Sequence, residues 1–514
     1  MRVALSLAFL LVPGVVPAQQ APAPRVPPAA RGSAAITAAD VSRRIALIAD
    51  DSMRGRATPS PELDKVAAYI AAEFKRFGLQ PGGDSGTYLQ RYRLVLSRFL
   101  PESSSVWATG GASAHWSVGQ DLLWAQGDPP PAPVVSVPVL VSGDPQAGGS
   151  LDSATVAGRV AILGFGPRLN AIASKLLPLK PAAIILVGAF PDSIWEKLPG
   201  RTGGVRVTNP NEQTGPSLPA VLVTRSQTVA PWLSQAGVNA DSLVGAAGQP
   251  LAARLLPGDT VHLVLWQQSQ GDASAPNVVG ILPGSDSALR HQYVLFTAHM
   301  DHIGVPAAGE GCTAKGADSI CNGADDDGSG TVAVLELARA FTSSPDRPKR
   351  SLIFMTVSGE ERGLWGSGYF ADHPTVPLDS VVADLNSDMV GRNWADTMAV
   401  IGREHSDLGG TLDSVAARHP ELHMTPVGDR WPQEGLYFRS DHFNFARKGV
   451  PVLFFTSGLH PDYHQVSDSP EKIDGEKEAR FAQLLYYLGV EVANAAEKPQ
   501  WNPDSYRKIV LGEP

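Results

Sequence analysis

The hydrophobic positions of this chain repeat with one spacing near the N-terminus and with other spacings further on. Between residues 37 and 77, apolar side chains recur at every third or fourth position, which is the period of a helix with one buried face. Gly78 and the Pro81-Gly82-Gly83 cluster then break the pattern, because these residues favour turns. The sequence therefore predicts helical structure over residues 37–77.

The middle of the chain, from about residue 117 to residue 271, has short apolar runs separated by proline and glycine. This pattern is typical of a strand-rich unit with many turns. A helical spacing occurs at residues 170–177, and the polar stretch 200–216 is predicted to be a long surface loop. The predicted strands are residues 134–141, 160–163, 182–187, 220–223 and 261–265.

From Asn277 onward, strand, loop and helix patterns alternate. Helices are predicted at residues 331–341 and 481–495, and such alternation indicates an α/β fold. We expect a mixed, mostly parallel central sheet that is covered by helices on both faces. The predicted strands of this sheet are residues 293–298, 352–357, 381–385 and 452–456.

These changes of pattern divide the chain into domains, as expected for 514 residues, which exceed one ordinary core. We predict a discontinuous α/β domain formed by residues 34–116 and 272–498. The strand-rich domain, residues 117–271, interrupts it. Residues 499–514 form a C-terminal tail.

The first residues have the pattern of a secretory signal peptide. Arg2 precedes an apolar run at residues 3–12, and Val16-Pro17-Ala18 offers small residues for cleavage. The run is too short to span a bilayer, so no stable membrane anchor is predicted. We therefore expect a signal peptide at residues 1–18, a Pro/Ala-rich leader at 19–33, and an exported protein that is periplasmic or extracellular.

Cys312 and Cys321, the only cysteines, are close together in sequence. An oxidising compartment favours a disulfide between them, while two free thiols or zinc ligation stay open as alternatives. The formal net charge of -9 argues against a nucleic-acid partner, because phosphate binding needs a basic surface. The sequence makes no prediction about oligomeric state.

Ionisable residues gather directly after the predicted strands, where open α/β sheets bind their ligands. The acidic residues 325–327 do not belong to an EF-hand calcium loop. With Gly328 as its invariant glycine, the first and last ligands would be Gly323 and Val334, which have no side-chain oxygen. Ser440-Asp441-His442 has the residue types of a hydrolase triad, but contiguous residues cannot adopt its geometry, so we interpret them as structural or pocket-lining. The candidate segments are His299-Met300-Asp301, Asp325-Asp326-Asp327, Glu360-Glu361, Asn386-Ser387-Asp388 and Tyr463-His464.

Together these segments favour a pair of metal ions. Nitrogen and oxygen ligands without thiolates suit zinc, and a shared aspartate suits two metals. The charges also balance, since Asp326, Glu361 and Asp388 with one hydroxide neutralise two Zn²⁺ ions. The sequence therefore predicts two Zn²⁺ per chain, although Co²⁺ or Mn²⁺ could substitute.

At these residues the sequence resembles metallopeptidase family twenty-eight, the di-zinc aminopeptidases related to glutamate carboxypeptidase II and the transferrin receptor. The strand-rich insert looks like a protease-associated domain, although no motif of its own supports this match. The matching stretches are residues 297–301, 322–330, 358–367, 386–389, and Tyr463-His464 with Ser467-Asp468.

The resemblance implies a zinc-exopeptidase fold and a role for each motif residue. It places His299 and Asp388 on one zinc and Glu361 and His464 on the other. The implied bridge is Asp326, which stands three positions before the serine of the Ser-Gly pair. It further implies Glu360 as general base, Asp301 as the residue that orients His299, and Tyr463 as a possible oxyanion donor.

The expected function is that of an exported metallopeptidase that removes N-terminal residues from peptides through a metal-bridging water and a Glu general base. A carboxypeptidase of the glutamate carboxypeptidase type stays open, because Arg392, Arg439 or Arg447 could bind a carboxylate. A non-catalytic receptor-like or binding relative would lack ligands, and none is missing here. Glutaminyl cyclisation on a one-zinc site is a further alternative, which two equivalents of bound zinc would exclude.

Overall fold

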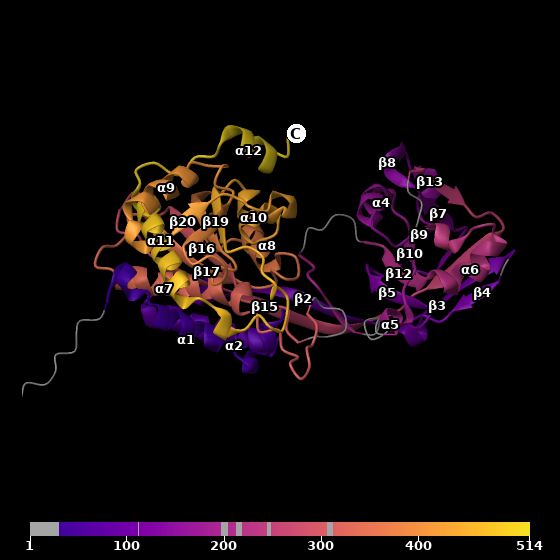
Figure 1. Cartoon of the computed structure of the whole chain (residues 1–514), viewed down its shortest axis with the longest axis horizontal. Helices are drawn as coiled ribbons and strands as arrows, with labels where there is room; N and C mark the ends of the chain where they lie inside the picture. Colours follow the sequence, from indigo (N-terminus) through magenta and orange to yellow (C-terminus); the bar gives the residue numbers. More distant parts are fainter. Residues whose placement is uncertain are drawn as a thin grey trace, which may run out of the picture.

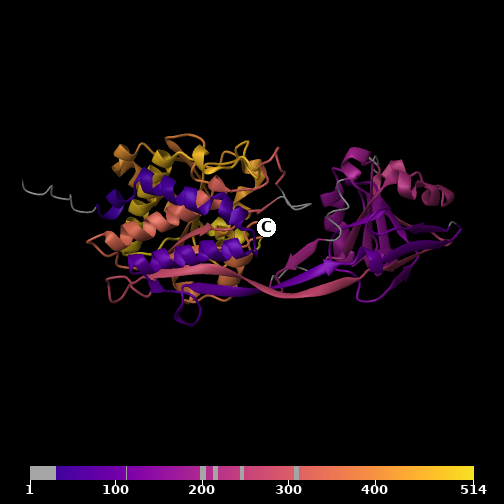
Figure 2. The same ribbon diagram turned by 90° about the horizontal axis from the view of Figure 1, so that it is seen from below.

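The computed structural model describes residues 30–111, 113–196, 204–211, 218–243, 248–305 and 312–513. The predicted signal peptide and most of the predicted leader lie outside the described residues. Two lobes are visible, joined by a long ribbon of strands (Figures 1 and 2). Within the described part of the chain, no helix is long and apolar enough to cross a membrane.

The ribbon consists of β2 (Leu89–Phe99) and β15 (Gln267–Leu282). They pair antiparallel from Phe99 opposite Gln267 to Leu89 opposite Val278. The outer half of β15 is polar and exposed, so its sequence carries no hydrophobic alternation. Neither ribbon strand was predicted, although β2 alternates buried and exposed residues over much of its length. The inner half of β15 is buried and pairs with β17 in the larger sheet.

The larger lobe contains a mixed sheet in the order β11-β2-β15-β17-β16-β18-β21-β19-β20, with β1 paired to β15. Its four central strands run parallel, whereas β15 and β19 pair antiparallel with them. The carboxyl ends of the central strands therefore meet at one edge. These strands are β16 (Tyr293–His299), β17 (Ser351–Val357), β18 (Val381–Ser387) and β21 (Val452–Thr456), and the others are β1 (Gln80–Pro81), β11 (Val205–Thr208), β19 (Thr397–Ile401) and β20 (Thr425–Val427).

Helices cover both faces of this sheet, which confirms the predicted α/β class. Alternate residues of β16 point to opposite faces: Phe296 packs with the helices on one face and Leu295 with those on the other. The first face carries α1 (Ala38–Ile48), α2 (Pro61–Phe77), α7 (Gly330–Ser343), α9 (Leu408–Arg418) and α11 (Gly475–Asn494). The opposite face carries α8 (Trp365–Asp372), α10 (His442–Ala446) and α12 (Pro503–Ile509).

The predicted helical stretch 37–77 is two helices rather than one. Between α1 and α2 the chain turns at Asp51–Arg56, where Arg54, Gly55 and Arg56 all have positive φ. Positive φ is incompatible with a right-handed helix, so the helix cannot continue. This turn brings the buried Arg56 beside the edge of the sheet where the strands end.

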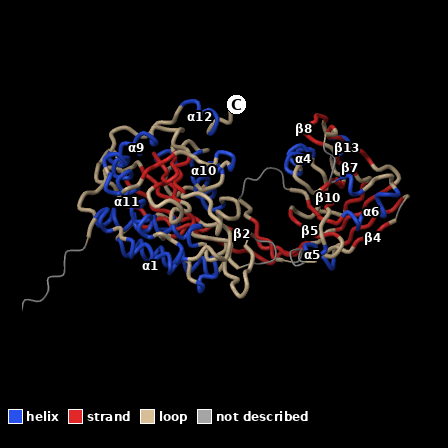
Figure 3. Tube along the Cα trace, in the orientation of Figure 1, coloured by secondary structure: helices blue, strands red, loops and turns tan. Residues whose placement is uncertain are grey.

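The smaller lobe has its own two sheets and its own core (Figure 3). A seven-stranded sheet has the order β5-β12-β10-β9-β7-β13-β8, and a four-stranded sheet has the order β4-β3-β14-β6. The strands are β3 (Ser105–Gly110), β4 (Ala114–Trp116), β5 (Leu122–Gln126), β6 (Val134–Ser136), β7 (Val139–Ser142), β8 (Asp144–Gly149), β9 (Val160–Gly164), β10 (Ala183–Gly188), β12 (Ala220–Arg225), β13 (Pro250–Leu255) and β14 (Asp259–Val264). The helices are α3 (Ser153–Val156), α4 (Leu169–Leu176), α5 (Asp192–Trp195) and α6 (Ser226–Gln235).

One part of the predicted surface loop 200–216 is a strand. Residues Val205–Thr208 form β11, which pairs antiparallel with β2 at the edge of the larger sheet. The Val-Arg-Val-Thr sequence alternates and is rich in β-branched residues, so it fits an edge strand. The polar composition of residues 200–216 as a whole led to the prediction of a loop. Whether the smaller lobe is a protease-associated domain stays a prediction.

Candidate metal centre

The candidate residues lie together because the parallel strands end at the same edge of the sheet. His299 is the last residue of β16, Asp388 follows β18, and Glu361 lies a few residues after the end of β17. Asp326 comes from the turn before α7, and His464 from the loop after β21. Five segments that are far apart in sequence thus place their polar side chains at one edge of the sheet.

One group of donors forms around His299. Its Nε2 atom lies 3.3 Å from Oδ1 of Asp326 and 3.6 Å from Oδ1 of Asp388. Ser440 Oγ donates to the other oxygen of Asp388, Oδ2, at 2.7 Å. This hydrogen bond leaves Oδ1 of Asp388 to face His299.

A second group forms around His464. Its Nε2 atom lies 3.1 Å from Oδ2 of Asp326 and 3.3 Å from Oε2 of Glu361. Burial lowers the pKa of His464, but the nearby carboxylates of Asp326 and Glu361 outweigh it and raise the pKa to about 10. The two groups thus share Asp326, each through a different oxygen.

These distances fit metal ligands. Two ligand atoms bound to one tetrahedral zinc at roughly 2.0–2.1 Å lie about 3.3 Å from each other. The contacts of His299 and His464 with Asp326, at 3.3 and 3.1 Å, are close to this value. The residues present therefore fit metal binding, with histidines facing both oxygens of the Asp326 carboxylate.

Asp327 has a different environment from Asp326, although its carboxylate lies near His299 and Asp388. Its Oδ2 accepts the main-chain N–H of His299 at 3.1 Å. Its Oδ1 accepts those of Gly330 and Met389 at 2.8 and 3.1 Å. Both oxygens are occupied by main-chain donors, so Asp327 ties the ends of β16, α7 and β18 together.

The turn that carries Asp326 is held from two sides. Asp468 accepts the main-chain N–H groups of Asp325 and Asp326 at 3.1 Å each. The buried Arg56 donates to the carbonyls of Asn322 and Gly323 at 2.5 and 2.6 Å. The Asp326-Asp327 peptide bond is cis.

Asp301 lies beside His299, but its carboxylate has other partners. Oδ2 accepts from Thr58 Oγ1 at 2.7 Å, and Oδ1 accepts the main-chain N–H of Glu360 at 3.3 Å. Nδ1 of His299 is 3.7 Å from Oδ1 of Asp301 and 3.1 Å from its main-chain carbonyl. Both the carbonyl and the carboxylate of Asp301 therefore face the imidazole nitrogen that points away from the metal centre.

Glu360 and Tyr463 line the pocket beside the two donor groups, together with His299, Asp326 and Asp388. Burial raises the pKa of the Glu360 carboxyl, and the neighbouring carboxylates of Glu361 and Asp388 raise it further against the opposing effect of His299. The phenol ring of Tyr463 stacks on His464 with ring centres 3.9 Å apart. Burial and the surrounding carboxylates raise the pKa of Tyr463, so its O–H remains a donor.

The structure adds His302, which sequence reasoning missed. His302 is fully buried, and its Nδ1 lies 2.7 Å from Oε1 of Glu361. The available signal was its position directly after His299-Met300-Asp301, one residue beyond the stretch that we interpreted. Its spacing alone does not distinguish a ligand from a neighbour of one.

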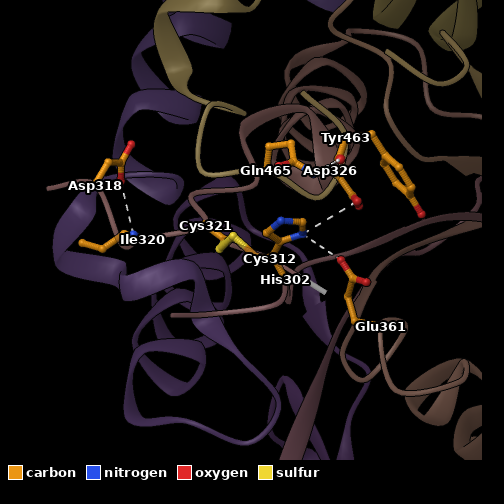
Figure 4. The surroundings of a disulfide bond; sticks show 9 residues. All are labelled: His302, Cys312, Asp318, Ile320, Cys321, Asp326, Glu361, Tyr463 and Gln465. Atoms are coloured by element: carbon orange, nitrogen blue, oxygen red, sulfur yellow. Dashed lines mark hydrogen bonds and ion pairs between the residues drawn. A yellow bond between two sulfur atoms is a disulfide. The ribbon is translucent and has the colours of Figure 1, made fainter. Parts of the chain in front are cut away.

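Cys312 and Cys321 form a disulfide, which resolves the alternatives that the sequence left open. The disulfide packs with Ile303 and Val466 in a small buried cluster. Ile303 follows His302, and Val466 lies two residues after His464. Figure 4 shows the disulfide on the side of His302 away from Asp326 and Glu361.

A comparison with protein families agrees with this geometry. Residues 277–489, which include every candidate ligand, match the model described as Peptidase family M28. This segment belongs to peptidase family M28. The match confirms the family resemblance that the motifs indicated.

Relatives of the M28 segment include named peptidases. The chain is 28% identical over 279 residues to a probable leucine aminopeptidase of Trichophyton verrucosum, covering 51% of this chain and 68% of the relative. It is 27% identical over 240 residues to aminopeptidase YwaD of Bacillus subtilis, covering 44% of this chain and 47% of that protein.

Solved structures share the fold across more than the M28 segment. An aminopeptidase from Aneurinibacillus sp. strain AM-1 superposes with a TM-score of 0.55 at 18% identity, covering 90% of this chain and 95% of that chain. The zinc aminopeptidase BSAP from Bacillus subtilis gives a TM-score of 0.51 at 17% identity, covering 90% and 96%. At these identities the likeness establishes the fold alone.

Proposed function

We propose that this chain is a zinc-dependent exopeptidase that removes N-terminal residues from peptides. The observation that carries this proposal is the arrangement of His299 and His464 on opposite oxygens of Asp326, beside Glu360. Relatives named as aminopeptidases and zinc metalloproteases support the same activity and the same metal.

In this proposal the two zinc ions have distinct ligands. His299 and Asp388 would hold one ion, Glu361 and His464 would hold the other, and Asp326 would be shared between them. When bound, zinc supplies Lewis acidity that acidifies water and polarises a scissile carbonyl. The buried surroundings of this centre strengthen such electrostatic effects.

The remaining residues handle protons and position the substrate. Glu360 accepts a proton from the attacking water and delivers it to the leaving amine, which suits a carboxyl whose pKa is raised by burial. Tyr463 keeps its proton and donates a hydrogen bond to the oxygen on which negative charge develops. Asp301, through its contacts with Thr58 and the Glu360 main chain, holds the loop that carries Glu360.

The pocket favours a free N-terminus with an apolar side chain. Bound zinc would neutralise Asp326 and Asp388, which leaves Glu360 as the carboxylate of this pocket that can attract an α-ammonium group. Leu436, Phe454 and Leu459 line the same pocket and offer apolar surface. We therefore expect preference for substrates with an unblocked, apolar first residue.

A second candidate is a carboxypeptidase, which one residue supports. Arg439 lines the same pocket and is the cation that could bind a substrate carboxylate. Its side chain is 42% exposed and lies 3.6 Å from Glu434, so it is partly neutralised. We favour the aminopeptidase, because this charge is partly neutralised and relatives are named as aminopeptidases.

We also propose that the protein is exported. The N-terminal pattern of Arg2, an apolar run and small residues supports a cleaved signal peptide. The Cys312–Cys321 disulfide agrees with an oxidising compartment.

The test is a substrate panel with purified protein. Aminoacyl-p-nitroanilides and free-amine peptides are compared with N-blocked peptides, with and without a chelator. We expect cleavage of free-amine substrates only, lost on chelation and restored by zinc. Preferential cleavage of N-blocked peptides from the C-terminus would establish the carboxypeptidase instead, and an Arg439→Gln variant would then lose that activity.

A further inference from the structure

His302 contacts the metal centre through Glu361. Nδ1 of His302 lies 2.7 Å from Oε1 of Glu361, while the other carboxylate oxygen, Oε2, lies 3.3 Å from Nε2 of His464. The two histidines therefore contact different oxygens of one carboxylate. Figure 4 shows the His302 ring between the disulfide and the carboxylates of Asp326 and Glu361.

The distances distinguish His302 from a metal ligand, although it forms a cluster with Asp326 and Glu361 that could hold an ion. A separation of 2.7 Å is within hydrogen-bond length, whereas two ligands of one tetrahedral zinc lie about 3.3 Å apart. The N–H is not aimed at Oε1 in this structure and neither buried atom has another hydrogen-bond partner, so a rotation of the Glu361 carboxylate would complete the bond. Nδ1 of His302 is also 3.8 Å from Oδ2 of Asp326, an oxygen that lies closer to His464. His302 is thus placed to bind Glu361 rather than a metal.

The surrounding chain fixes the ring in this position. Gly323 packs so closely that a Cβ atom there would lie 2.4 Å from Cγ of His302. The main-chain N–H of His302 donates to the carbonyl of Arg56 at 3.4 Å. On the next residue, Ile303 packs against the Cys312–Cys321 disulfide. A ring held this tightly can determine the orientation of its partner.

We propose that His302 is a positioning residue that donates its Nδ1–H to Oε1 of Glu361 and thereby turns Oε2 toward the metal shared with His464. This inference rests on the proposed di-zinc function and deepens it. Partners of this kind, which orient a ligand without touching the metal, change metal affinity by about 10–100-fold when they are removed. The effect falls mainly on the ion held by Glu361 and His464, because His302 contacts both residues and, on Asp326, the oxygen that faces His464.

The test compares two substitutions of similar size. Asparagine places an amide N–H close to the position of Nδ1, whereas leucine has no donor. We expect His302→Asn to bind two zinc ions with nearly wild-type affinity. We expect His302→Leu to bind one ion normally and the second about 10–100-fold more weakly, as measured by competition with a chromophoric chelator. A His262→Leu variant, altered on β14 of the smaller lobe at a half-buried position, serves as the control.

The outcomes distinguish a failure of the positioning role of His302 from a failure of the di-zinc function. Equal affinity for both ions in His302→Leu and wild type would overturn the positioning role. So would an equal loss in His302→Asn and His302→Leu, because it would indicate packing rather than donation. Fewer than two zinc ions on the wild-type chain would instead contradict the di-zinc function, a result visible before any variant is made. The visible spectrum of the Co²⁺-substituted protein provides a second readout, since only His302→Leu should change the second metal's bands.

Discussion

Nε2 of His464 lies 3.1 Å from Oδ2 of Asp326. The opposite oxygen, Oδ1, lies 3.3 Å from His299. One carboxylate therefore faces both histidines, and it does so through separate oxygens. The neighbouring Asp327 uses its oxygens for main-chain donors instead. Adjacent residues of one chemical type thus have different expected roles.

Replacing either aspartate with asparagine tests these roles. We expect Asp326→Asn to lose most bound zinc and all measurable peptidase activity, because a neutral amide cannot neutralise two cations. We expect Asp327→Asn to retain its zinc stoichiometry but to have a free energy of unfolding lower by about 1–3 kcal/mol, since an amide NH₂ replaces one of two oxygens that accept main-chain N–H groups. Metal analysis and denaturant unfolding measure the two effects, and the reverse pattern would make Asp327 the bridge.

Glu360→Gln should separate catalysis from metal binding. Glutamine keeps the size of the side chain but cannot accept a proton, so we expect turnover to fall about 10²–10⁴-fold. Both zinc ions should remain, because the structure places Glu361 and not Glu360 beside His464. The matched variant Glu361→Gln should lose zinc. Substantial activity in Glu360→Gln would remove its assignment as general base.

The central strands of the larger sheet were predictable because each is an apolar run that ends in polar residues. β21 begins and ends at the predicted residues, and β16 extends one residue further, to His299. Such strands are buried on both faces, so nearly all of their residues are apolar and the run is visible in the sequence. The same strand ends led to the candidate residues.

The rest of the fold and of the candidate site depends on contacts between distant segments, which no local sequence pattern indicates. The sequence of the exposed part of β15 has the polar composition of a loop, because neither face of this strand is buried there. The partnership of His302 with Glu361 joins residues that lie on different strand ends. The distinction between Asp326 and Asp327 rests on which main-chain N–H groups lie nearby, and only the folded chain decides that.

Gly323 provides a test of how tightly the metal centre is packed. Its φ of +57° and the 2.2 Å that would separate a Cβ atom from the Asp326 carbonyl leave no room for a side chain. We expect Gly323→Ala to lower both thermal stability and zinc content. Gly410→Ala is the control: Gly410 lies on α9 with nothing within 4 Å of its Cβ position, so this change should stabilise the protein by about 0.5–1 kcal/mol. Unaltered zinc binding in Gly323→Ala would contradict the packing seen here.

Removing the metal should make stability depend on pH through His464. Burial lowers its pKa, but Asp326 and Glu361 outweigh this and raise it to about 10, compared with 6.5 for an ordinary histidine. The metal-free folded state therefore holds a proton that the unfolded state has released. This contribution is complete below about pH 6.5 and is lost as the pH rises toward 10.

Zinc replaces that proton, so the loaded protein should lack this loss. Melting temperatures of chelated and zinc-loaded protein, measured across the same pH range, give the comparison. In the chelated His464→Gln variant the decline above pH 6.5 should be smaller than in the chelated wild type. An identical decline in both would assign the pH dependence to other groups.

The register of the ribbon has a consequence for protein engineering. Phe99 and Gln267 lie opposite each other, and the main-chain N–H of Leu100 donates to the carbonyl of Trp266 at 2.9 Å. The chain thus leaves and re-enters the ribbon at adjacent points, as it would at a hairpin. A short turn grafted between β2 and β15 could replace the whole smaller lobe, or carry a different module in its place, without altering the path of any strand that ends at the metal centre.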